Sequence, residues 1–327
     1  MAYQSVIKQS ANNENDLLNK LYDFLTITLG WTSHDDQRPN YFVVTSNGED
    51  GKAKLCMKFT KGSGKISVYQ YLSWDNTNHT GQKQSGSISY TYIKSSSSLH
   101  YYWFYGDKDH ILVVTKVYCY YAFYGGLYDT IYNKDYAVTQ ASINSGDNVS
   151  VNVDDPSCLS EGEHYLIMDD NNCERAMIFS ISGTLVTFEH LNNSYESGAR
   201  VGEDPMPNVI SKYDLNSNGG ILFPQFYYNG DVGDDYNYVQ SFLPINNVEG
   251  YMDSEYRYTG RRYFAPIMIA NVNNNYEEFL GWLKHIYGFN KNYQPVVSED
   301  TISCGGKTYD VFVIYNSDYV LVIPREV

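Results

Sequence analysis

Short segments of alternating apolar and polar residues fill the sequence from about residue 41 to 124, and they constrain the fold more than any other feature. Clusters of Gly, Ser, Asn and Asp separate six such segments: YFVVTS, AKLCMKFT, KISVYQYLSW, SISYTYIKS, HYYWFYG and HILVVTKVYCYYAFYGG. Successive side chains of a strand point to opposite faces, so this alternation between turn-forming clusters predicts β-strands. We expect an antiparallel meander here.

Tyrosine dominates the aromatic residues of these segments and of the whole chain. There are 34 Tyr against 14 Phe and 4 Trp among 327 residues. Aromatic side chains fit strands, and tyrosine suits positions with one apolar end and one hydrated end. The chain is also long enough to bury at least one sizeable core. We therefore expect a β-rich fold with large contact surfaces.

Residues 13 to 29 form the clearest helix in the sequence. Asn13 can cap its start, Asp16 lies in its first turn, and Gly30 ends it. The side chains that follow helical spacing are Leu17, Leu21, Phe24, Leu25 and Thr28. We expect this helix to pack on the meander. A second, short helix is predicted from Tyr276 to His285.

The pattern changes twice after the meander. Residues 141 to 203 read as a second β-rich unit, a small barrel or sandwich inserted into the chain. Residues 205 to 275 are rich in Pro, Asn, Tyr and Gly and weakly periodic, which favours long ordered loops or an extended arm over another core. We thus predict a mainly β (α+β) fold. Residues 1–140 and 205–327 would form a helix-and-sheet main domain, and residues 141–204 an inserted β module.

No sequence motif indicates a catalytic site. The seven histidines show no metal-ligand spacing, and there is no GxSxG elbow, GxGxxG turn or P-loop. His34, Asp35 and Asp36 could be imagined as a base with its orienting carboxylate, but adjacent side chains rarely point at one another. We expect no enzymatic activity and no cofactor.

One segment resembles a calcium loop. Oxygen-bearing side chains stand at its first, third and fifth positions, before a glycine: Asp214, Asn216 and Asn218. The twelfth position holds Gln225 in place of a bidentate Glu, and no predicted helix flanks the loop. A tight Asn/Gly turn is the interpretation we prefer, with a bound cation as the alternative.

Tyrosines also provide the candidate interface residues. Those that end the meander alternate along a strand, so one face belongs to the core and the other is free for a subunit contact: Tyr118, Tyr120, Tyr121 and Tyr124. Three more lie in the loop-rich segment: Tyr227, Tyr228 and Tyr236. Stacking on sugars is the alternative role for such rings.

The charge of the chain restricts its partners. The formal net charge is -15, and no cluster of Lys and Arg marks a nucleic-acid groove. No apolar run is long enough to span a membrane, and the first 31 residues do not resemble an export signal. We expect neither sequence-specific nucleic-acid binding nor membrane insertion.

Three stretches together resemble a family of virion structural proteins of tailed bacteriophages and prophages, found in the head-tail or tail region. The first is LGW at 29–31 with YYWFYGDKDHILVVTKVYCYYAFYGGLY at 101–128. The second is GEHYLIMDDNNCERAMIFSISGTLVTFEHLNNSYESGARVGEDPMP, which resembles a recurrent phage β module through Glu174, Ser182-Gly183 and the close from Ser197 to Val201. The third is LGWLKHIYGFNKNYQPVVSEDTISCGGKTYDVFVIYNSDYVLVIP at 280–324.

The resemblance covers about two thirds of the chain and implies a non-enzymatic subunit of a symmetric tail or neck assembly, of the tail completion, terminator or collar type. It implies a homo-oligomer, with a ring expected. Other virion proteins of the tail or head-tail junction would be its partners. The protein would be assembled in the host cytoplasm and located in the virion. The sequence departs from the family through the polar stretch KNYQPVV and the tyrosine-rich residues 210–264.

The alternative function is that of a receptor-binding or decoration protein that contacts carbohydrate or capsid. A tail-associated hydrolase is a third candidate.

Overall fold

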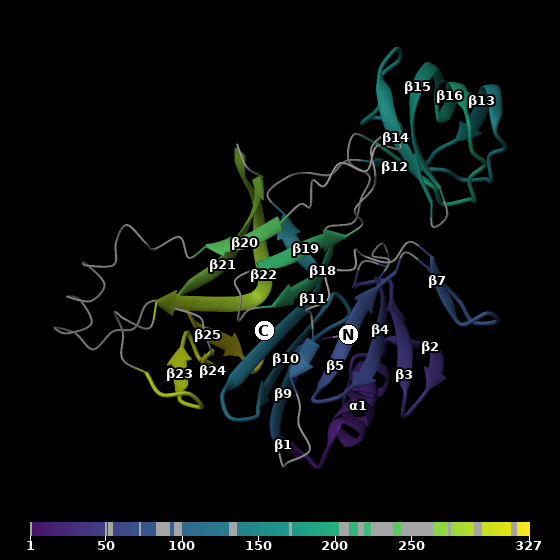
Figure 1. The fold of residues 1–327 in the computed structure, drawn as a ribbon. Helices are drawn as coiled ribbons and strands as arrows, with labels where there is room; N and C mark the ends of the chain where they lie inside the picture. The colour runs from purple at the N-terminus through teal and green to yellow at the C-terminus, as the bar shows by residue number, and fades with distance from the viewer. Residues whose placement is uncertain are drawn as a thin grey trace.

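The computed structural model describes the chain in fifteen ranges, and its fold is mainly β, as expected. The ranges are 2–49, 51, 55–71, 73–82, 92–94, 100–130, 136–169, 172–202, 209–214, 219–223, 238–242, 264–273, 276–290, 296–314 and 319–327. Within them, strands form several antiparallel sheets and one helical segment lies near the N-terminus. Figure 1 shows the arrangement.

The predicted N-terminal helix is confirmed. It comprises α1 (Glu14–Asp23) and a wider, π-helical turn, η1 (Phe24–Thr28). Asn13 caps it, because its Oδ1 accepts a hydrogen bond of 3.0 Å from the backbone N–H of Asp16. Gly30 follows with a φ of +68°, a left-handed conformation that glycine adopts without strain.

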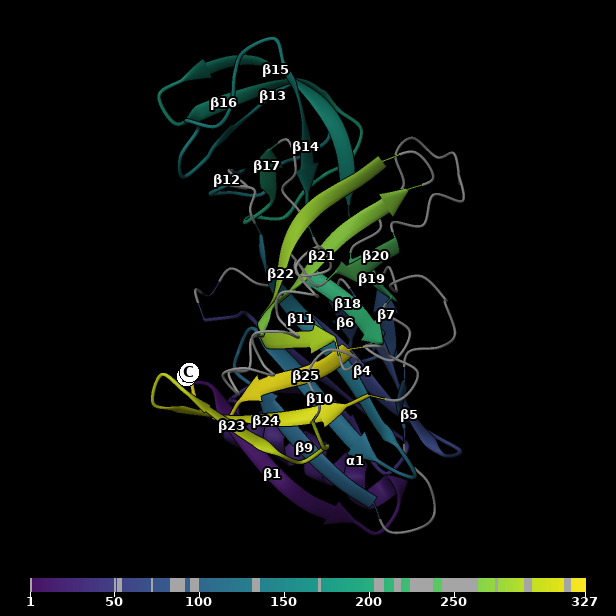
Figure 2. The same ribbon diagram turned by 90° about the vertical axis from the view of Figure 1, so that its left-hand side faces the viewer.

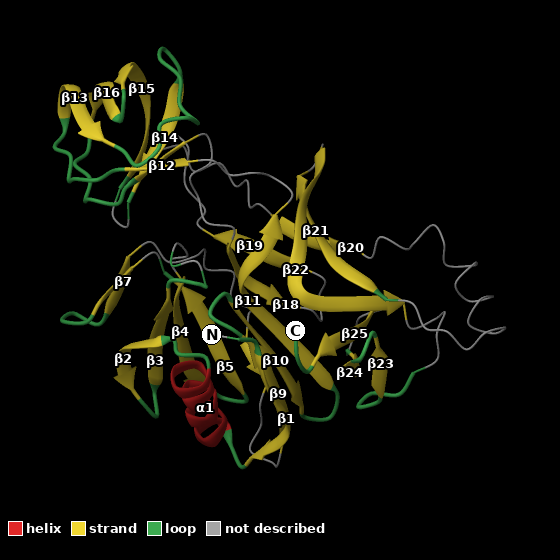
Figure 3. Cartoon of the chain, turned by 180° about the vertical axis from the view of Figure 1, so that it is seen from behind, coloured by secondary structure: helices red, strands yellow, loops and turns green. Residues whose placement is uncertain are grey.

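A five-stranded sheet covers one side of this helix. Its order is β2-β3-β4-β5-β8, all antiparallel: β2 (Thr32–Gln37), β3 (Tyr41–Ser46), β4 (Leu55–Gly62), β5 (Lys65–Gln70) and β8 (Tyr92–Lys94). Figure 3 shows α1 in red against these strands. A hairpin of β6 (Ser73–Asp75) and β7 (Thr80–Gln82) forms a separate two-stranded sheet. The predicted meander is thus confirmed as far as β8.

The remaining meander segments belong to a different, twelve-stranded sheet. The stretch 110–126, read as one segment, is a hairpin of two strands that turns at Val117–Cys119. The sheet order is β1-β9-β10-β11-β18-β19-β20-β21-β22-β25-β24-β23, and β11 also pairs with β22. The bounds are β1 (Gln4–Ala11), β9 (His100–Gly106), β10 (His110–Lys116), β11 (Tyr120–Thr130), β18 (Val209–Asp214), β19 (Gly219–Phe223), β20 (Tyr238–Phe242), β21 (Ala265–Asn273), β22 (Tyr276–Asn290), β23 (Thr301–Cys304), β24 (Lys307–Val313) and β25 (Tyr319–Pro324).

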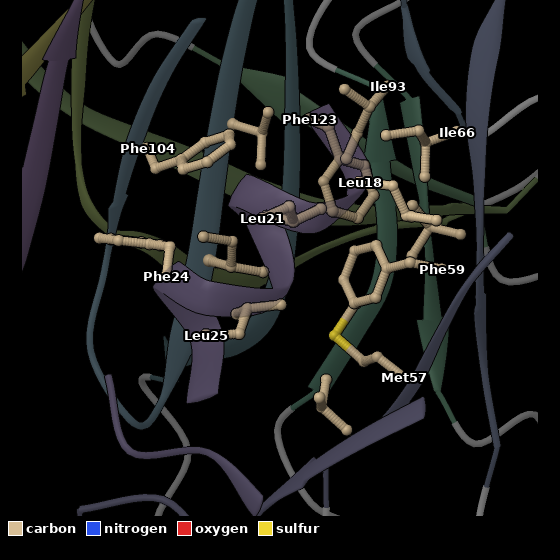
Figure 4. Close-up of a cluster of buried hydrophobic side chains, with 14 of the residues drawn as sticks. Leu18, Leu21, Phe24, Leu25, Met57, Phe59, Ile66, Ile93, Phe104 and Phe123 are labelled. Atoms are coloured by element: carbon tan, nitrogen blue, oxygen red, sulfur yellow. The ribbon is translucent and has the colours of Figure 1, made fainter. Parts of the chain in front are cut away.

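Strands β9, β10 and β11 lie between two cores. One face packs on α1 and the five-stranded sheet through side chains that include Phe104, Val113 and Phe123, and Figure 4 shows part of this cluster. The other face packs on residues of the C-terminal strands, and Figure 2 shows β24 and β25 lying across β9 and β10. Trp103 and Phe312 meet there, with ring centroids 5.0 Å apart.

Two predictions for the C-terminal half are wrong. The segment 276–285 is the first part of strand β22, not a helix. Leu283 and Ile286 are both buried although they are three residues apart, because His285 between them has a φ of +56° and interrupts the alternation. The segment 205–275 also contains four strands of the sheet, β18 to β21, where loops were expected.

The strands between residues 136 and 202 form a small barrel with its own core. The order is β12-β17-β14-β15-β16-β13, made of β12 (Tyr136–Val138), β13 (Gly146–Asn152), β14 (His164–Met168), β15 (Cys173–Ser182), β16 (Leu185–Leu191) and β17 (Arg200–Gly202). A bridge between Thr139 and Val153 joins the outermost strands and closes the sheet. Figure 1 shows this group apart from the other strands. Its status as an independent domain, residues 141–204, stays a prediction.

Candidate functional site

The candidate interface tyrosines of the β10–β11 hairpin fall into different environments. Tyr124 is 0% exposed and Tyr121 is 8% exposed, while Tyr120 is half-buried. Tyr118 is 66% exposed, in the turn that joins the two strands. The chain's own α1 and C-terminal strands cover both faces of this strand, so Tyr121 and Tyr124 belong to its cores, and a subunit contact at this hairpin stays a prediction. The exposed end of the hairpin remains available for a contact with another subunit.

This end forms a surface that we call the hairpin-end patch, defined by Lys8, Tyr101, Lys116, Tyr118, Tyr120 and Glu299. Tyr101 and Tyr120 lie on either side of Lys116 in the strand register, and Tyr118 meets Tyr121 edge to face at 5.7 Å between ring centroids. The register places Tyr101, Lys116 and Tyr120 together, because residues directly opposite on neighbouring strands share one face of the sheet. Tyr118 lies at the end of this face in the turn, and its partner Tyr121 belongs to the other face.

Glu299 connects the charged members of the patch. Its Oε1 accepts hydrogen bonds from Lys116 Nζ at 2.8 Å and from the hydroxyl of Tyr120, and its Oε2 accepts one from Lys8 Nζ. Partial burial alone would raise the pKa of Glu299, but the hydrogen bonds from Lys116, Lys8 and Tyr120 outweigh it and lower that pKa to about 2. The hydrogen bond with Glu299 in turn raises the pKa of Lys116.

The patch is locally positive. Two ammonium groups share one carboxylate, and the ammonium groups also lie near aromatic rings, Lys8 at 5.1 Å from the ring centroid of Tyr101 and Lys116 at 4.9 Å from that of Tyr120. The chain as a whole carries a formal charge of -15. A second copy of the chain therefore carries a net charge of opposite sign to this patch.

A second polar group lies buried between β9, β10 and β22. His110 Nδ1 lies 3.0 Å from Asp107 Oδ1, and His285 Nε2 lies 3.8 Å from Asp107 Oδ2. The rings of Tyr3 and Tyr124 flank His110, with centroids 6.0 and 5.5 Å away. These contacts hold the N-terminal segment and β22 against the β9–β10 turn.

The same group sets the charge states around Asp107. Burial would raise the pKa of Asp107, but its hydrogen bond with His110 and the backbone N–H of Asp109 lower it to about 2. Burial lowers the pKa of His285, and the neighbouring His110 adds to that effect. A close backbone approach at Gly126 supports the turn, since a Cβ there would lie 2.4 Å from the carbonyl oxygen of Asp109.

The imagined pairing within His34, Asp35 and Asp36 does not form. His34 Nε2 lies 3.1 Å from the carbonyl oxygen of Trp74, and Asp36 pairs with Arg38 at 2.8 Å. Asp35 instead meets His79, whose Nδ1 lies 2.8 Å from Asp35 Oδ2. His79 comes from the turn between β6 and β7, 44 residues further along, so no local spacing could have revealed it.

The structure gives no site geometry for the candidate cation loop or for the later tyrosines. Asp214 ends β18, while Asn216, Asn218, Tyr227, Tyr228 and Tyr236 lie outside the described residues. In the ranges that the structure describes, no three His, Cys, Asp or Glu side chains are grouped so that they could hold a metal ion.

Comparison with known proteins gives no family. No protein-family model matches the chain, and no curated protein matches it either. Among the described residues, no helix is long and apolar enough to cross a membrane.

Proposed function

We propose that the chain is a non-enzymatic structural protein of a tailed bacteriophage, present in the tail or neck of the virion as one copy of a symmetric assembly. The resemblance of three sequence stretches to virion proteins suggests the class. The hairpin-end patch is the observation that carries the role as an assembly subunit, because it combines an exposed aromatic ring with positive charge on an acidic chain.

The patch suits a contact between copies. A closed ring repeats one heterologous contact, in which a patch on one copy meets a different surface on the next. Charge complementarity favours that pairing, since a positive patch meets an acidic neighbour. Tyrosine is also a common anchor residue in such contacts. A terminator, tail completion or collar subunit needs this kind of contact and no cofactor.

The fold around the patch supports a subunit contact of fixed geometry. Strands β9 to β11 are packed on both faces, and the barrel of residues 136–202 is closed by the bridge between Thr139 and Val153. Both features fix side chains at the surface without further ligands. A subunit of a symmetric particle requires such a fixed contact geometry.

The barrel favours the second candidate, a receptor-binding or decoration protein. Phe179 is 58% exposed on β15, and Leu185 at the start of β16 is also exposed. Aromatic residues are enriched in binding interfaces, so Phe179 is the candidate contact residue of this surface. In this reading the barrel contacts a capsid or receptor and the two large sheets attach it to the particle.

Imaging of intact particles separates the two candidates. We expect density that fits this chain in a closed ring at the neck or along the tail axis. Density at a fibre tip or on the capsid surface would favour the binding role instead. Particles in which mass spectrometry detects no copy of the chain would rule out both.

A further inference from the structure

Strand β22 changes partners at a hinge that contains His285. Before the hinge, residues 281–283 pair with β11, and after it residues 287–290 pair with β25. Between these two parts, His285 has a φ of +56°, a left-handed conformation that is uncommon for a residue with a Cβ. Figure 3 shows the sharp bend of β22. A change at His285 therefore acts on both parts of the strand.

The side chain of His285 lies beside a buried histidine and a carboxylate. His285 Nε2 lies 3.8 Å from Asp107 Oδ2, and the ring centroids of His285 and His110 are 5.5 Å apart. Asp107 has its shorter contact with His110 Nδ1, at 3.0 Å, and it also accepts a hydrogen bond of 2.7 Å from the backbone N–H of Asp109. A proton on His285 would therefore gain only the longer contact with this carboxylate.

The other charged groups near His285 already pair with one another. Lys284 Nζ lies 2.6 Å from Asp109 Oδ2 in the β9–β10 turn and 3.6 Å from Asp129 Oδ1 on β11. Tyr3 and Tyr124 add no charge, because burial raises the pKa of both hydroxyl groups well above its ordinary value. No further carboxylate of the described residues lies within ion-pair distance of His285.

These surroundings keep His285 neutral near pH 7. Burial lowers its pKa most, and the positive charges of His110 and Lys284 act in the same direction. The carboxylates of Asp107 and Asp129 oppose this effect without reversing it. The folded chain therefore holds an uncharged imidazole at the hinge of β22.

The N-terminal segment depends on the same histidine. The ring of Tyr3 meets His285 edge to face at 5.2 Å between centroids and stacks on His110 at 6.0 Å. Tyr3 comes directly before β1, the edge strand of the twelve-stranded sheet, which pairs with β9. An edge strand has one neighbouring strand, so the contact of Tyr3 is a substantial part of what holds its start.

We propose that these contacts form an acid-released clamp. A neutral His285 keeps Tyr3 and the hinge of β22 against His110 and Asp107, and a proton on His285 releases them. A charged imidazole gains solvation when Tyr3 and β22 move away, because burial then no longer opposes its charge. The inference does not depend on where the protein lies in a particle.

The pH range of the release follows from the charge states. The pKa of His285 in the folded chain lies below its ordinary value of about 6.5, so the open state binds the proton more readily. The clamp is therefore closed above about pH 7 and weakens as the pH falls below about 6.5, by at most about tenfold per pH unit because one proton is involved. Asp107 titrates separately, with a pKa of about 2.

Hydrogen exchange of the whole purified chain at about pH 7.5 and about pH 5.5 tests the clamp, after correction for the intrinsic effect of pH on exchange. We expect faster exchange at the lower pH in β1 and in residues 281–286, by up to about tenfold per pH unit, with β4 and β5 unchanged. His285→Asn removes the titrating group and keeps a residue that tolerates a left-handed backbone, so it should abolish this acid response. His164→Asn changes an exposed histidine of the barrel and should leave the response as in the wild type.

A second variant and a second region keep the test decisive. Where circular dichroism shows that His285→Asn does not fold, His285→Gly takes its place, because glycine also adopts the left-handed conformation. An acid response of equal size in the variant and in the wild type would overturn the role of His285. Exchange that accelerates equally in β4 and β5 would indicate global unfolding and overturn the local release, and a wild-type chain without any acid response would overturn the clamp itself.

Discussion

The two faces of strands β9 to β11 bury similar aromatic side chains in different surroundings. The face toward α1 is almost entirely hydrocarbon, with Phe104, Val113 and Phe123 packed on helix and sheet. The face toward the C-terminal strands contains Trp103 and Tyr105 together with buried charges. There, Tyr105 donates a hydrogen bond of 2.8 Å to Asp310, which also accepts from Arg325 Nη2 at 2.7 Å.

The difference shows why the two faces place different demands on the sequence. A hydrocarbon face needs only apolar residues of suitable size at alternate positions. A face that buries a tyrosine hydroxyl or a carboxylate needs a specific partner for each polar atom. These partners come from segments about 200 residues away, so the second face fixes how the C-terminal strands are placed.

The largest expected effect is on the apolar face. Phe104→Ala removes a ring that is 1% exposed and lies 5.4 Å from the ring centroid of Phe24. We expect it to lower the free energy of unfolding by about 4 kcal/mol, because the cavity cannot fully collapse between two sheets and a helix. Urea unfolding followed by circular dichroism measures the change. A loss below about 1 kcal/mol would mean that this face is not a packed core.

The second-largest loss of unfolding free energy is expected on the polar face, toward the C-terminal strands. Asp310→Asn removes the charge that pairs with Arg325 and accepts from Tyr105, and we expect a loss of about 3 kcal/mol. Arg325→Gln in the same background should add little, because the pair is already broken. Additive losses in the double variant would show that these residues do not act together.

Acid should weaken the contact around Asp107. Its folded-state pKa is about 2, below the ordinary value of about 3.9 for an unfolded Asp. The resulting stabilisation is therefore present above about pH 4 and is lost as the pH falls from there through 2. Over that window we expect about 2 kcal/mol to disappear, and Asp107→Asn should show a smaller pH slope than Glu326→Gln, which changes an exposed carboxylate. Equal slopes would contradict this assignment.

The charged part of the hairpin-end patch should matter less for stability. Glu299→Gln leaves Lys8 and Lys116 without their shared carboxylate, and we expect a loss of about 1 kcal/mol because the site is partly hydrated. The loss should shrink in high salt, and unfolding curves at two salt concentrations measure it. An effect that does not depend on salt would point to packing instead of charge.

The sequence predicted features that depend on neighbours along the chain. Asn13, Gly30 and the spacing of Leu17 and Leu21 predicted the helix. Alternation predicted four strands of the five-stranded sheet, β3, β4, β5 and β8, but not β2. The small barrel was also anticipated from its short strands and turns. Each of these signals lies within a few residues of the structure it produces.

Features that depend on distant segments were missed. The helix predicted at 276–285 failed because this segment pairs with β21 in an irregular register, with a shift between Phe279 and Gly281, and such a shift interrupts the alternation that marks a strand. The alternation around Tyr124 could not reveal which segment covers its second face, because the covering strands β24 and β25 lie about 190 residues later in the chain. Glu299 and His79 carried no local signal, since their partners come from remote strands.

The oligomeric state of Tyr118→Ser tests the central claim, that the hairpin-end patch is the contact between subunits. The residue is 66% exposed and loses one edge-to-face contact with Tyr121, so the free energy of unfolding should fall by about 1 kcal/mol or less. Phe179→Ser is the matched control, an exposed aromatic residue on the barrel. We predict that native mass spectrometry finds an assembly for the wild type and for Phe179→Ser, and smaller species for Tyr118→Ser. An assembly that survives Tyr118→Ser and is lost with Phe179→Ser would contradict the account and place the contact on the barrel.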